Sequence, residues 1–319
     1  MFKVLLVEKI DQRAVDLLSQ VAEITYGRAF DEATLMDQAR EVDGIVLRAQ
    51  GKATRRLMEN APRLKVAARH GVGVDNIDVE AATDLGIQVV NTPLANMESV
   101  AEHAFGILLD LSKVICKVDR GLRKGVWREK SEFNGTEARG KTLGIVGAGR
   151  VGARVAEIGI KGFDMKVLYR DVVSNPRLDA LGARRCELDE LLSQSDYVSL
   201  HVPLLPETDH LIGRRELALM KPTAFLLNIS RGQVVDQEPL VEALKAGRIA
   251  GAGLDVFEVE PLPPDNPFKD MDNVIITPHM ASHTREGLLA MAMVVKDVIA
   301  VLEGRPPEFP VNHPAKLRG

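Results

Sequence analysis

The sequence has few aromatic residues and almost no cysteine. Phe, Tyr and Trp together make up 4% of the 319 residues, and only two cysteines occur, Cys116 and Cys186. Two cysteines in unrelated segments cannot build a disulfide framework or a cysteine-ligated metal cage. We therefore expect both thiols to be reduced and structural, and we predict no metal site.

The sequence also lacks an excess of charge of one sign and any long apolar run. Its 41 Lys and Arg residues and 45 Asp and Glu residues give a net charge of −4. Binding to nucleic acid or to an anionic membrane favours a basic excess, so neither partner is predicted. The apolar run 1–8 is too short for a secretory signal, and no segment approaches the roughly 20 apolar residues of a membrane span. We expect a cytoplasmic protein.

Apolar, strand-like runs alternate with helical patterns through nearly the whole chain. This alternation is typical of α/β proteins whose parallel sheets are covered on both faces. The runs fall into two groups, and 319 residues suit two domains of ordinary size. The predicted strands of the first group are 3–7, 23–26, 44–47, 65–68 and 88–91. Those of the second group are 142–146, 166–169, 197–201, 224–229, 251–255 and 274–277.

Segment 142–152 combines a predicted strand, a glycine-rich turn and the start of a helix. Gly147, Gly149 and Gly152 form Gly-x-Gly-x-x-Gly directly after the strand, and Asp171 ends the next strand about 20 residues on. In this context Gly147 permits a tight turn, Gly149 lets the backbone approach a pyrophosphate, and Gly152 allows close helix packing. The N–H groups at the helix start favour phosphate, and Asp171 would accept hydrogen bonds from the adenosine ribose. We predict a dinucleotide cofactor.

These patterns predict an α/β fold of two doubly wound parallel-sheet domains, in which a Rossmann NAD-binding domain is inserted into a flavodoxin-like substrate domain. The substrate domain is expected to comprise residues 1–95 and 290–319, and the dinucleotide-binding domain residues 96–289. The last helical stretch, 284–302, is expected to leave the second domain and to pack on the first.

A second glycine-rich sequence, 71–76, follows the predicted strand 65–68 but lacks a third glycine. One interpretation is a plain turn between strand and helix. The interpretation that we favour is a loop whose backbone N–H groups, at Val72 and Gly73, hold an anionic substrate that faces the cofactor. Ligands of open α/β sheets lie at the carboxyl ends of the strands, so two such edges are expected to form a cleft.

Three polar residues, Arg231, Glu260 and His279, follow successive strands of the second group. An arginine can hold a substrate carboxylate through two parallel charge-assisted hydrogen bonds. A histidine can take a hydroxyl proton as hydride leaves, and a neighbouring carboxylate orients the ring and favours its charged form. Each residue alone has an ordinary interpretation as a surface or turn residue. Their joint placement favours oxidation of an alcohol beside a carboxylate.

The combined motifs resemble those of the D-isomer-specific 2-hydroxyacid dehydrogenases, the family of phosphoglycerate, glyoxylate/hydroxypyruvate and D-lactate dehydrogenases. The resemblance covers nearly the whole chain and rests on segments 71–78, 91–93, 99–103, 147–152, 230–232, 254–257, 260–261 and 277–279. It implies that Arg231 binds the substrate carboxylate, that Glu260 orients the histidine, and that His279 is the acid/base.

The resemblance also implies further cofactor contacts and a dimer. It places Asp255 on the nicotinamide amide, and Val202 and Pro203 beside the adenine. Segment 96–118 resembles the dimerisation helix of the family, so we expect a homodimer in which His103 is structural. The predicted cofactor-binding set is Gly147, Gly149, Arg150, Val151, Gly152, Asp171, Val202, Pro203, Ile229, Ser230, Arg231, Asp255, His279 and Ser282.

Two choices stay open within this family. Arg170 could attract the 2′-phosphate of NADP, but Asp171 would repel it, so NAD is favoured. Arg48 and Arg69 are either solvated surface charges or groups that meet a substrate phosphate or carboxylate. Arg at position 48 occurs in phosphoglycerate enzymes of the family, so 3-phosphoglycerate is predicted ahead of glyoxylate and hydroxypyruvate. The predicted substrate-binding residues are Arg48, Val72, Gly73, Arg231 and His279.

A function from another class is also compatible with this fold, because some of its members are nucleotide-sensing transcriptional corepressors. Such a protein needs a peptide-docking surface and often has disordered tails. This chain has no low-complexity segment and retains Arg231, Glu260 and His279. We therefore predict an NAD-dependent D-2-hydroxyacid dehydrogenase, an oxidoreductase acting on the CH–OH group of its donor.

Overall fold

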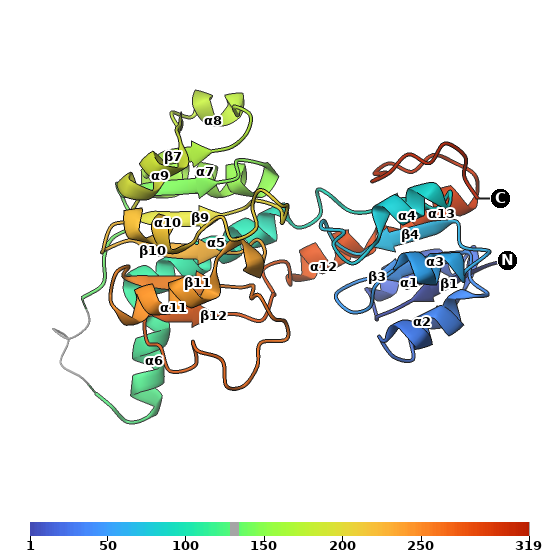
Figure 1. Cartoon of the computed structure of the whole chain (residues 1–319), viewed down its shortest axis with the longest axis horizontal. Coiled ribbons are helices and arrows are strands. Elements are labelled where there is room, and N and C mark those ends of the chain that lie inside the picture. The colour runs from blue at the N-terminus through green and yellow to red at the C-terminus, as the bar shows by residue number, and fades with distance from the viewer. Residues whose placement is uncertain (128–133, 319) are drawn as a thin grey trace. The chain divides into compact units, whose positions relative to one another are not determined.

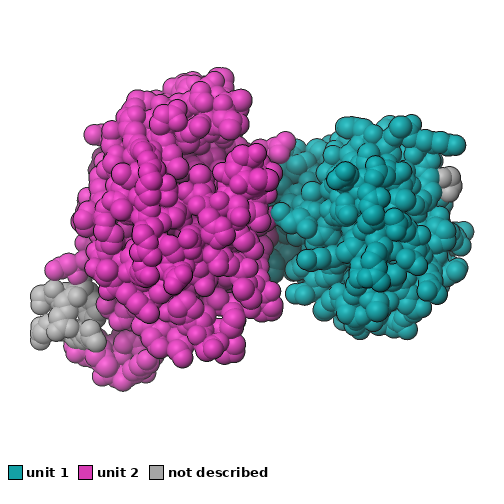
Figure 2. Space-filling view, in the orientation of Figure 1, with its two compact units in different colours: residues 1–96, 283–319 teal, residues 97–282 magenta. Residues whose placement is uncertain are grey.

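The computed structural model describes residues 1–127 and 134–318 (Figure 1). The chain divides into two compact units, of which the first holds residues 1–96 and 283–319 and the second residues 97–282 (Figure 2). The chain returns to the first unit at residue 283, earlier than the expected 290, because the helix that begins at Arg285 packs on the first helix of the chain. The first and last described residues, 1 and 318, both lie in the first unit.

The first unit contains a five-stranded parallel sheet in the order β2-β1-β3-β4-β5, the flavodoxin-like order. Val4 and Leu6 pack into the core on one face of this sheet, whereas Leu5 packs into the core on the other face. Burial on both faces explains why the strands read as continuous apolar runs. The strands are β1 (Phe2–Leu6), β2 (Ala22–Tyr26), β3 (Gly44–Leu47), β4 (Val66–Arg69) and β5 (Gln88–Val90).

Six helices pack around this sheet among the described residues of the first unit. The predicted helix 284–302 is two helices, since a turn at Met293 and Val294 separates α12 from α13. Thr284 accepts a hydrogen bond from the N–H of Gly287 and so begins α12. The helices are α1 (Gln12–Leu18), α2 (Glu32–Ala39), α3 (Arg55–Glu59), α4 (Val79–Asp84), α12 (Arg285–Ala292) and α13 (Val295–Leu302).

The second unit contains a seven-stranded parallel sheet in the order β12-β11-β10-β9-β6-β7-β8. The first six strands of the unit follow the Rossmann order 3-2-1-4-5-6, and β12 extends the edge. The predicted α/β class with two doubly wound parallel sheets is confirmed. The strands are β6 (Thr142–Val146), β7 (Lys166–Arg170), β8 (Arg184–Arg185), β9 (Tyr197–Leu200), β10 (Phe225–Asn228), β11 (Gly251–Leu254) and β12 (Val274–Ile276).

The helices of the second unit begin with α5 (Met97–Lys113) and α6 (Ile115–Arg123). The prediction of one helix over 96–118 is wrong, because Val114 adopts a left-handed φ of 51° and the chain turns there. The N–H of Cys116 donates to Asp110 Oδ1 at 2.7 Å and stabilises the turn. Among the described residues of this unit, the helices that follow are α7 (Arg150–Phe163), α8 (Pro176–Ala180), α9 (Leu188–Gln194), α10 (Arg214–Leu219), the short 3₁₀ helix η2 (Gly232–Val234) and α11 (Gln237–Lys245).

The two cysteines differ in their surroundings. Neither Cys116 nor Cys186 forms a disulfide; Cys186 is buried, as a structural thiol would be, whereas Cys116 is exposed on α6. In the described part of the chain, no helix combines the length and apolar character that a bilayer crossing needs.

Candidate active site

The glycine-rich turn after β6 requires glycine at its first and last positions. Gly147 has a φ of 93°, and a Cβ there would come within 2.8 Å of the carbonyl carbon of His201. A Cβ on Gly152 would overlap the carbonyl oxygen of Gly147. The turn therefore brings β6, α7 and the loop after β9 closer together than any side chain allows.

The middle glycine lies where a ligand can approach the backbone. Apart from atoms of Gly149 and its two chain neighbours, no atom lies within 4 Å of the position that a Cβ on Gly149 would take. Gly149 is also the N-cap of α7, and no side chain caps this helix. The N–H groups of Arg150 and Val151 therefore have no partner within the helix, and together with the positive end of the helix dipole they fit a pyrophosphate.

Asp171 follows β7 and contacts the glycine-rich turn. Its Oδ2 accepts a hydrogen bond from the N–H of Ala148 at 2.7 Å. The guanidinium groups of Arg170 and Arg185 donate to the backbone carbonyl of Asp171 at 2.5 and 2.9 Å. Arg170 also lies 3.4 Å from a carboxylate oxygen of Glu187. Arg170 thus has two partners within the chain. The sequence gives no signal for Arg185, because β8 has no apolar pattern.

Asp255 follows β11 and anchors the loop 277–281 that follows β12. Its Oδ1 accepts hydrogen bonds from the hydroxyl of Thr277 at 2.6 Å and the N–H of Met280 at 2.9 Å, and Oδ2 accepts from Ala281 N–H at 2.9 Å. Burial alone would raise the pKa of Asp255, but the hydrogen bonds that the carboxylate accepts outweigh burial and lower the pKa below its ordinary value. The side chain therefore remains ionised although it is 1% exposed.

The same loop holds His279 in an unusual backbone conformation. Its φ is 49°, in the left-handed region that residues other than glycine rarely adopt. The N–H of His279 donates to the carbonyl of Asp255 at 2.7 Å, which helps to hold this conformation. Such strained residues persist only where the surrounding contacts fix them, and they cluster at functional sites.

His279 and Glu260 form a hydrogen-bonded pair. His279 Nδ1 lies 2.7 Å from Glu260 Oε2, and Glu260 Oε1 accepts from the N–H of Phe257 at 3.0 Å. Burial alone would raise the pKa of Glu260, but the His279 and Phe257 hydrogen bonds and the charges of His279 and Arg231 lower it overall. The ionised carboxylate fixes the ring by Nδ1 and leaves Nε2 as the atom that can exchange a proton.

Arg231 lies in the loop after β10, close enough for its charge to act on Glu260. The carbonyl of Arg231 accepts from Asn228 Nδ2 at 2.8 Å. A Cβ on the following residue, Gly232, would overlap the carbonyl group of Phe257. The loops after β10 and β11 are therefore in direct backbone contact, which sets Arg231 near the Glu260–His279 pair.

The other predicted cofactor residues follow strands of the same sheet at its carboxyl edge. Ser230 is buried, and its hydroxyl donates to Asn228 Oδ1 at 2.9 Å. The residues follow β9, β10 and β12 and are Val202, Pro203, Ile229, Ser230 and Ser282. Their cofactor contacts stay predictions.

The predicted substrate residues of the first unit lie at the carboxyl edge of its sheet. Arg48 follows β3, and its Nη2 lies 3.4 Å from Nε2 of His283. Arg69 donates to three backbone carbonyls, among them those of Arg48 and, at 2.7 Å, Gly73. The Arg69 guanidinium therefore shapes the 71–73 loop. This structural role differs from both predicted roles, a solvated surface charge and a group that meets the substrate.

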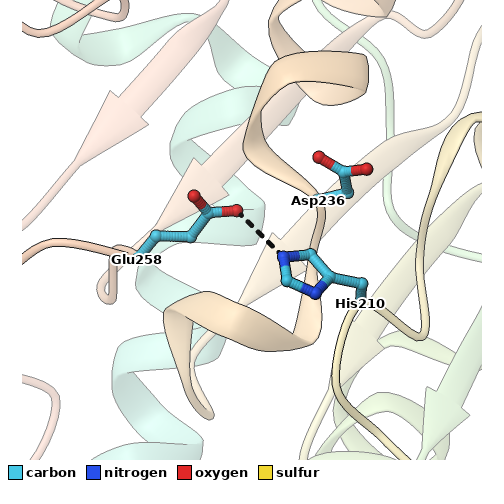
Figure 3. A group of neighbouring side chains, drawn as sticks. All are labelled: His210, Asp236 and Glu258. Carbon is cyan, nitrogen blue, oxygen red and sulfur yellow. Dashed lines mark ion pairs between the residues drawn. The ribbon is translucent and has the colours of Figure 1, made fainter.

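One group of side chains among the described residues is close enough to share a metal ion. Ligand atoms of His210, Asp236 and Glu258 all lie within 4.8 Å of one another. Figure 3 shows the His210 ring turned toward Glu258, with Nε2 3.5 Å from Oε1. Glu258 Oε1 also accepts from the N–H of Gln237 at 2.9 Å. We interpret the group as a polar contact that joins the loops after β9 and β11.

A pocket of about 450 Å³ opens at the opposite, amino edge of the second sheet. Residues that precede strands line it, among them Lys141, Asp196 and Asn273, together with Cys116 and Lys117 of α6. None of the predicted cofactor or catalytic residues lines this pocket. The predicted residues of the second unit instead follow its strands, at the carboxyl edge.

The seven-stranded sheet, the glycine-rich turn and Asp171 define a Rossmann-type dinucleotide-binding protein. Residues 105–281 match the family described as "D-isomer specific 2-hydroxyacid dehydrogenase, NAD binding domain". The chain belongs to the D-isomer-specific 2-hydroxyacid dehydrogenase family, a family of NAD-dependent oxidoreductases, and its second unit contains the NAD-binding domain.

Two curated relatives and one solved structure illustrate this membership. The D-3-phosphoglycerate dehydrogenase of Synechocystis sp. is 42% identical over 316 residues, which are 98% of this chain and 56% of the relative. The glyoxylate reductase of Thermococcus litoralis is 43% identical over 322 residues, 97% of this chain and 96% of the relative. The structure of the TT0316 protein from Thermus thermophilus has a TM-score of 0.92 and 38% identity, and the match covers 97% of this chain and 100% of that one. The chain thus spans a little over half of the phosphoglycerate relative.

Proposed function

We propose that the protein interconverts a 2-hydroxy acid and a 2-keto acid in an NAD-dependent reaction. The observation that carries the proposal is the 2.7 Å contact between His279 and Glu260, near Arg231 and at the same sheet edge as the glycine-rich turn. NAD, when bound, accepts or supplies the hydride. Family membership supports the same reaction.

The cofactor-binding roles follow from the donors and acceptors of the second unit. The turn of Gly147, Gly149 and Gly152, with the start of α7, would hold the pyrophosphate. Asp171 would accept from the ribose hydroxyls and repel a 2′-phosphate, which favours NAD over NADP. Asp255 Oδ2 accepts one hydrogen bond from Ala281, and a carboxylate oxygen can accept a second one from the nicotinamide amide.

The catalytic roles follow from the side chains around His279. Arg231 would bind the substrate carboxylate with two parallel hydrogen bonds, one arm also polarising the C2 oxygen. In reduction His279 Nε2 would deliver a proton to the developing alkoxide, and in oxidation the same atom would take the hydroxyl proton. Glu260 would fix the ring and favour its protonated form.

The proposed substrate follows from groups at the carboxyl edge of the first sheet. We place 3-phosphoglycerate first and glyoxylate and hydroxypyruvate next, because Arg48 follows β3 at the carboxyl edge of the first sheet and adds a positive charge there. Its carbonyl accepts from the Arg69 guanidinium, which also donates to Gly73 of the 71–73 loop. Val72 and Gly73 would offer their N–H groups to the anionic end of the substrate. The relatives named above include both a phosphoglycerate and a glyoxylate enzyme at nearly equal identity.

We further propose that the protein is a homodimer. α6 has no buried residue, and Ile115 and Leu122 on it are 56% and 50% exposed. Trp127, the single tryptophan, follows at 81% exposure. A second copy of the chain covering this face would bury these side chains. Light scattering, which measures the mass in solution, tests this proposal. We expect the mass of a dimer for the parent and a weaker dimer for Leu122→Arg. We also propose that the protein is cytoplasmic, as predicted from the sequence.

The test of the function is turnover by the purified protein. NADH and NADPH are offered with glyoxylate, hydroxypyruvate, 3-phosphohydroxypyruvate and pyruvate, and the nicotinamide absorbance is followed. We expect NADH oxidation with at least one of these acids. NADH binding without turnover on any acid would instead favour the corepressor-like function.

A further inference from the structure

His103 lies on α5 and contacts two residues that shape the 277–281 loop. Its Nε2 is 3.1 Å from Thr277 Oγ1 and 3.5 Å from Asp255 Oδ1. The hydroxyl of Thr277 has one proton, and it donates this proton to Asp255 Oδ1 at 2.6 Å. Thr277 Oγ1 can therefore only accept from His103. The ring of His103 accordingly carries a proton on Nε2 and donates it.

The partners of His103 hold the loop on both sides of His279. Asp255 binds Thr277 before the catalytic candidate and Met280 after it, and its carbonyl accepts the N–H of His279 itself. His103 joins this set from α5. Its side chain is only 19% exposed, so water replaces its hydrogen bond poorly.

We propose that His103 is a positioning residue for the reaction, which aligns His279 by donating from Nε2 to Thr277 and Asp255. The inference rests on the proposed acid/base role of His279. His103 exchanges no proton with the substrate and acts through the 277–281 loop. The structural role expected from the sequence becomes a specific one: His103 sets the place of the catalytic ring.

The strain at His279 explains why one hydrogen bond matters. A left-handed conformation at a residue other than glycine persists only while the surrounding contacts fix it. Without the His103 donor, Thr277 loses a partner and the loop can relax away from the φ of 49° at His279. A displacement of about 1 Å at a reacting group costs roughly 100-fold in rate.

Two substitutions at the same position separate positioning from packing. In His103→Gln the amide nitrogen takes the place of Nε2 and keeps the donor, whereas in His103→Asn the donor is one methylene too short. We expect His103→Asn to lower kcat about 10- to 100-fold, with the KM and Kd for NADH within about threefold of the parent. His103→Gln is expected to retain kcat within about threefold.

Ser112→Ala is the matched control on the same helix. Ser112 makes one side-chain hydrogen bond to a strand residue, Tyr197, at 2.8 Å. It lies near the other end of α5, away from the 277–281 loop. We expect Ser112→Ala to have a lower Tm than the parent and the same kcat. The comparison therefore separates a general weakening of α5 from the loss of His279 alignment.

In an active parent enzyme, equal kcat values for His103→Gln and His103→Asn would overturn the inference, as would an equal loss of kcat in Ser112→Ala. The proposed function fails by a different result, the absence of turnover in the parent or full activity in His279→Ala. Either of those results would remove the inference together with the function on which it rests.

Discussion

Replacing Gly232 with Ala perturbs the candidate site through the backbone alone. Gly232 follows Arg231, and a Cβ built on it would overlap the carbonyl carbon and oxygen of Phe257. Phe257 in turn holds Glu260 through its N–H at 3.0 Å. The added methyl group therefore pushes apart the two loops that carry Arg231 and Glu260.

The size of the effect follows from the contact geometry. Carbon atoms in contact lie about 3.5–4.0 Å apart, so the two loops must separate by roughly 1 Å or more. Overpacking of this kind costs about 1–3 kcal/mol of stability. A shift of about 1 Å between reacting groups lowers the rate roughly 100-fold. We therefore expect Gly232→Ala to fold with a lower Tm and to lose about 10- to 100-fold in kcat for keto-acid reduction.

Gly162→Ala provides the control for this experiment. Gly162 lies in the last turn of α7 and is exposed. Outside the adjoining residues and the backbone of its own helix, no atom lies within 4 Å of the position of a Cβ. Ala there should leave kcat unchanged and stabilise the helix by up to about 1 kcal/mol. Steady-state kinetics and thermal melts of both variants check the pair. A Gly232→Ala enzyme with the kcat of the parent would refute the proposed link between loop spacing and catalysis.

Three further substitutions test individual roles. Asp171→Ala should weaken NADH binding and improve the relative use of NADPH, because it removes a carboxylate that accepts from the ribose and repels a 2′-phosphate. A parent enzyme that already prefers NADPH would show that Arg170 and Arg185 govern this choice instead. Arg231→Lys keeps the charge but loses the planar fork. The value of kcat/KM for 2-keto acids should therefore fall, by an amount that corresponds to a loss of about 2–3 kcal/mol of transition-state stabilisation, while NADH binding is retained. Near-parental kinetics in that variant would exclude Arg231 from substrate binding. His279→Ala should lower turnover about 100- to 10,000-fold in both directions, as stopped-flow and steady-state assays can measure, and an unaffected rate would assign the proton transfer to another group.

The sequence predicts the strands well because most of them are buried on both faces. β6 is an apolar run of this kind, and its predicted bounds agree with the structure. β8 carries no such signal, since Arg184 and Arg185 are exposed and become a strand only by pairing with β7. The break at Val114 is also invisible in the sequence, because valine seldom adopts a left-handed φ and the turn depends on contacts such as that of Asp110.

The candidate site likewise has features that the sequence predicts and contacts that it does not. Glycine spacing predicts the turn at Gly147 because only glycine fits its φ and its close approach to His201. Sequence order likewise places Arg231, Glu260 and His279 at the ends of successive strands. Contacts that depend on side-chain rotamers are not encoded in any local pattern. The donation of Arg69 to backbone carbonyls and the His103–Thr277 contact therefore emerge only from the structure.

The coupling of His279 to Glu260 is tested most directly by the pH dependence of Glu260→Gln. Keto-acid reduction needs His279 protonated, and the Glu260 carboxylate, kept ionised by its lowered pKa, favours that proton. Gln keeps the approximate shape but removes the negative charge that faces the ring. The pH at which reduction fades and the pH at which oxidation begins should therefore both move down relative to the parent. Identical pH–rate profiles for Glu260→Gln and the parent would contradict the pairing of these two side chains in catalysis.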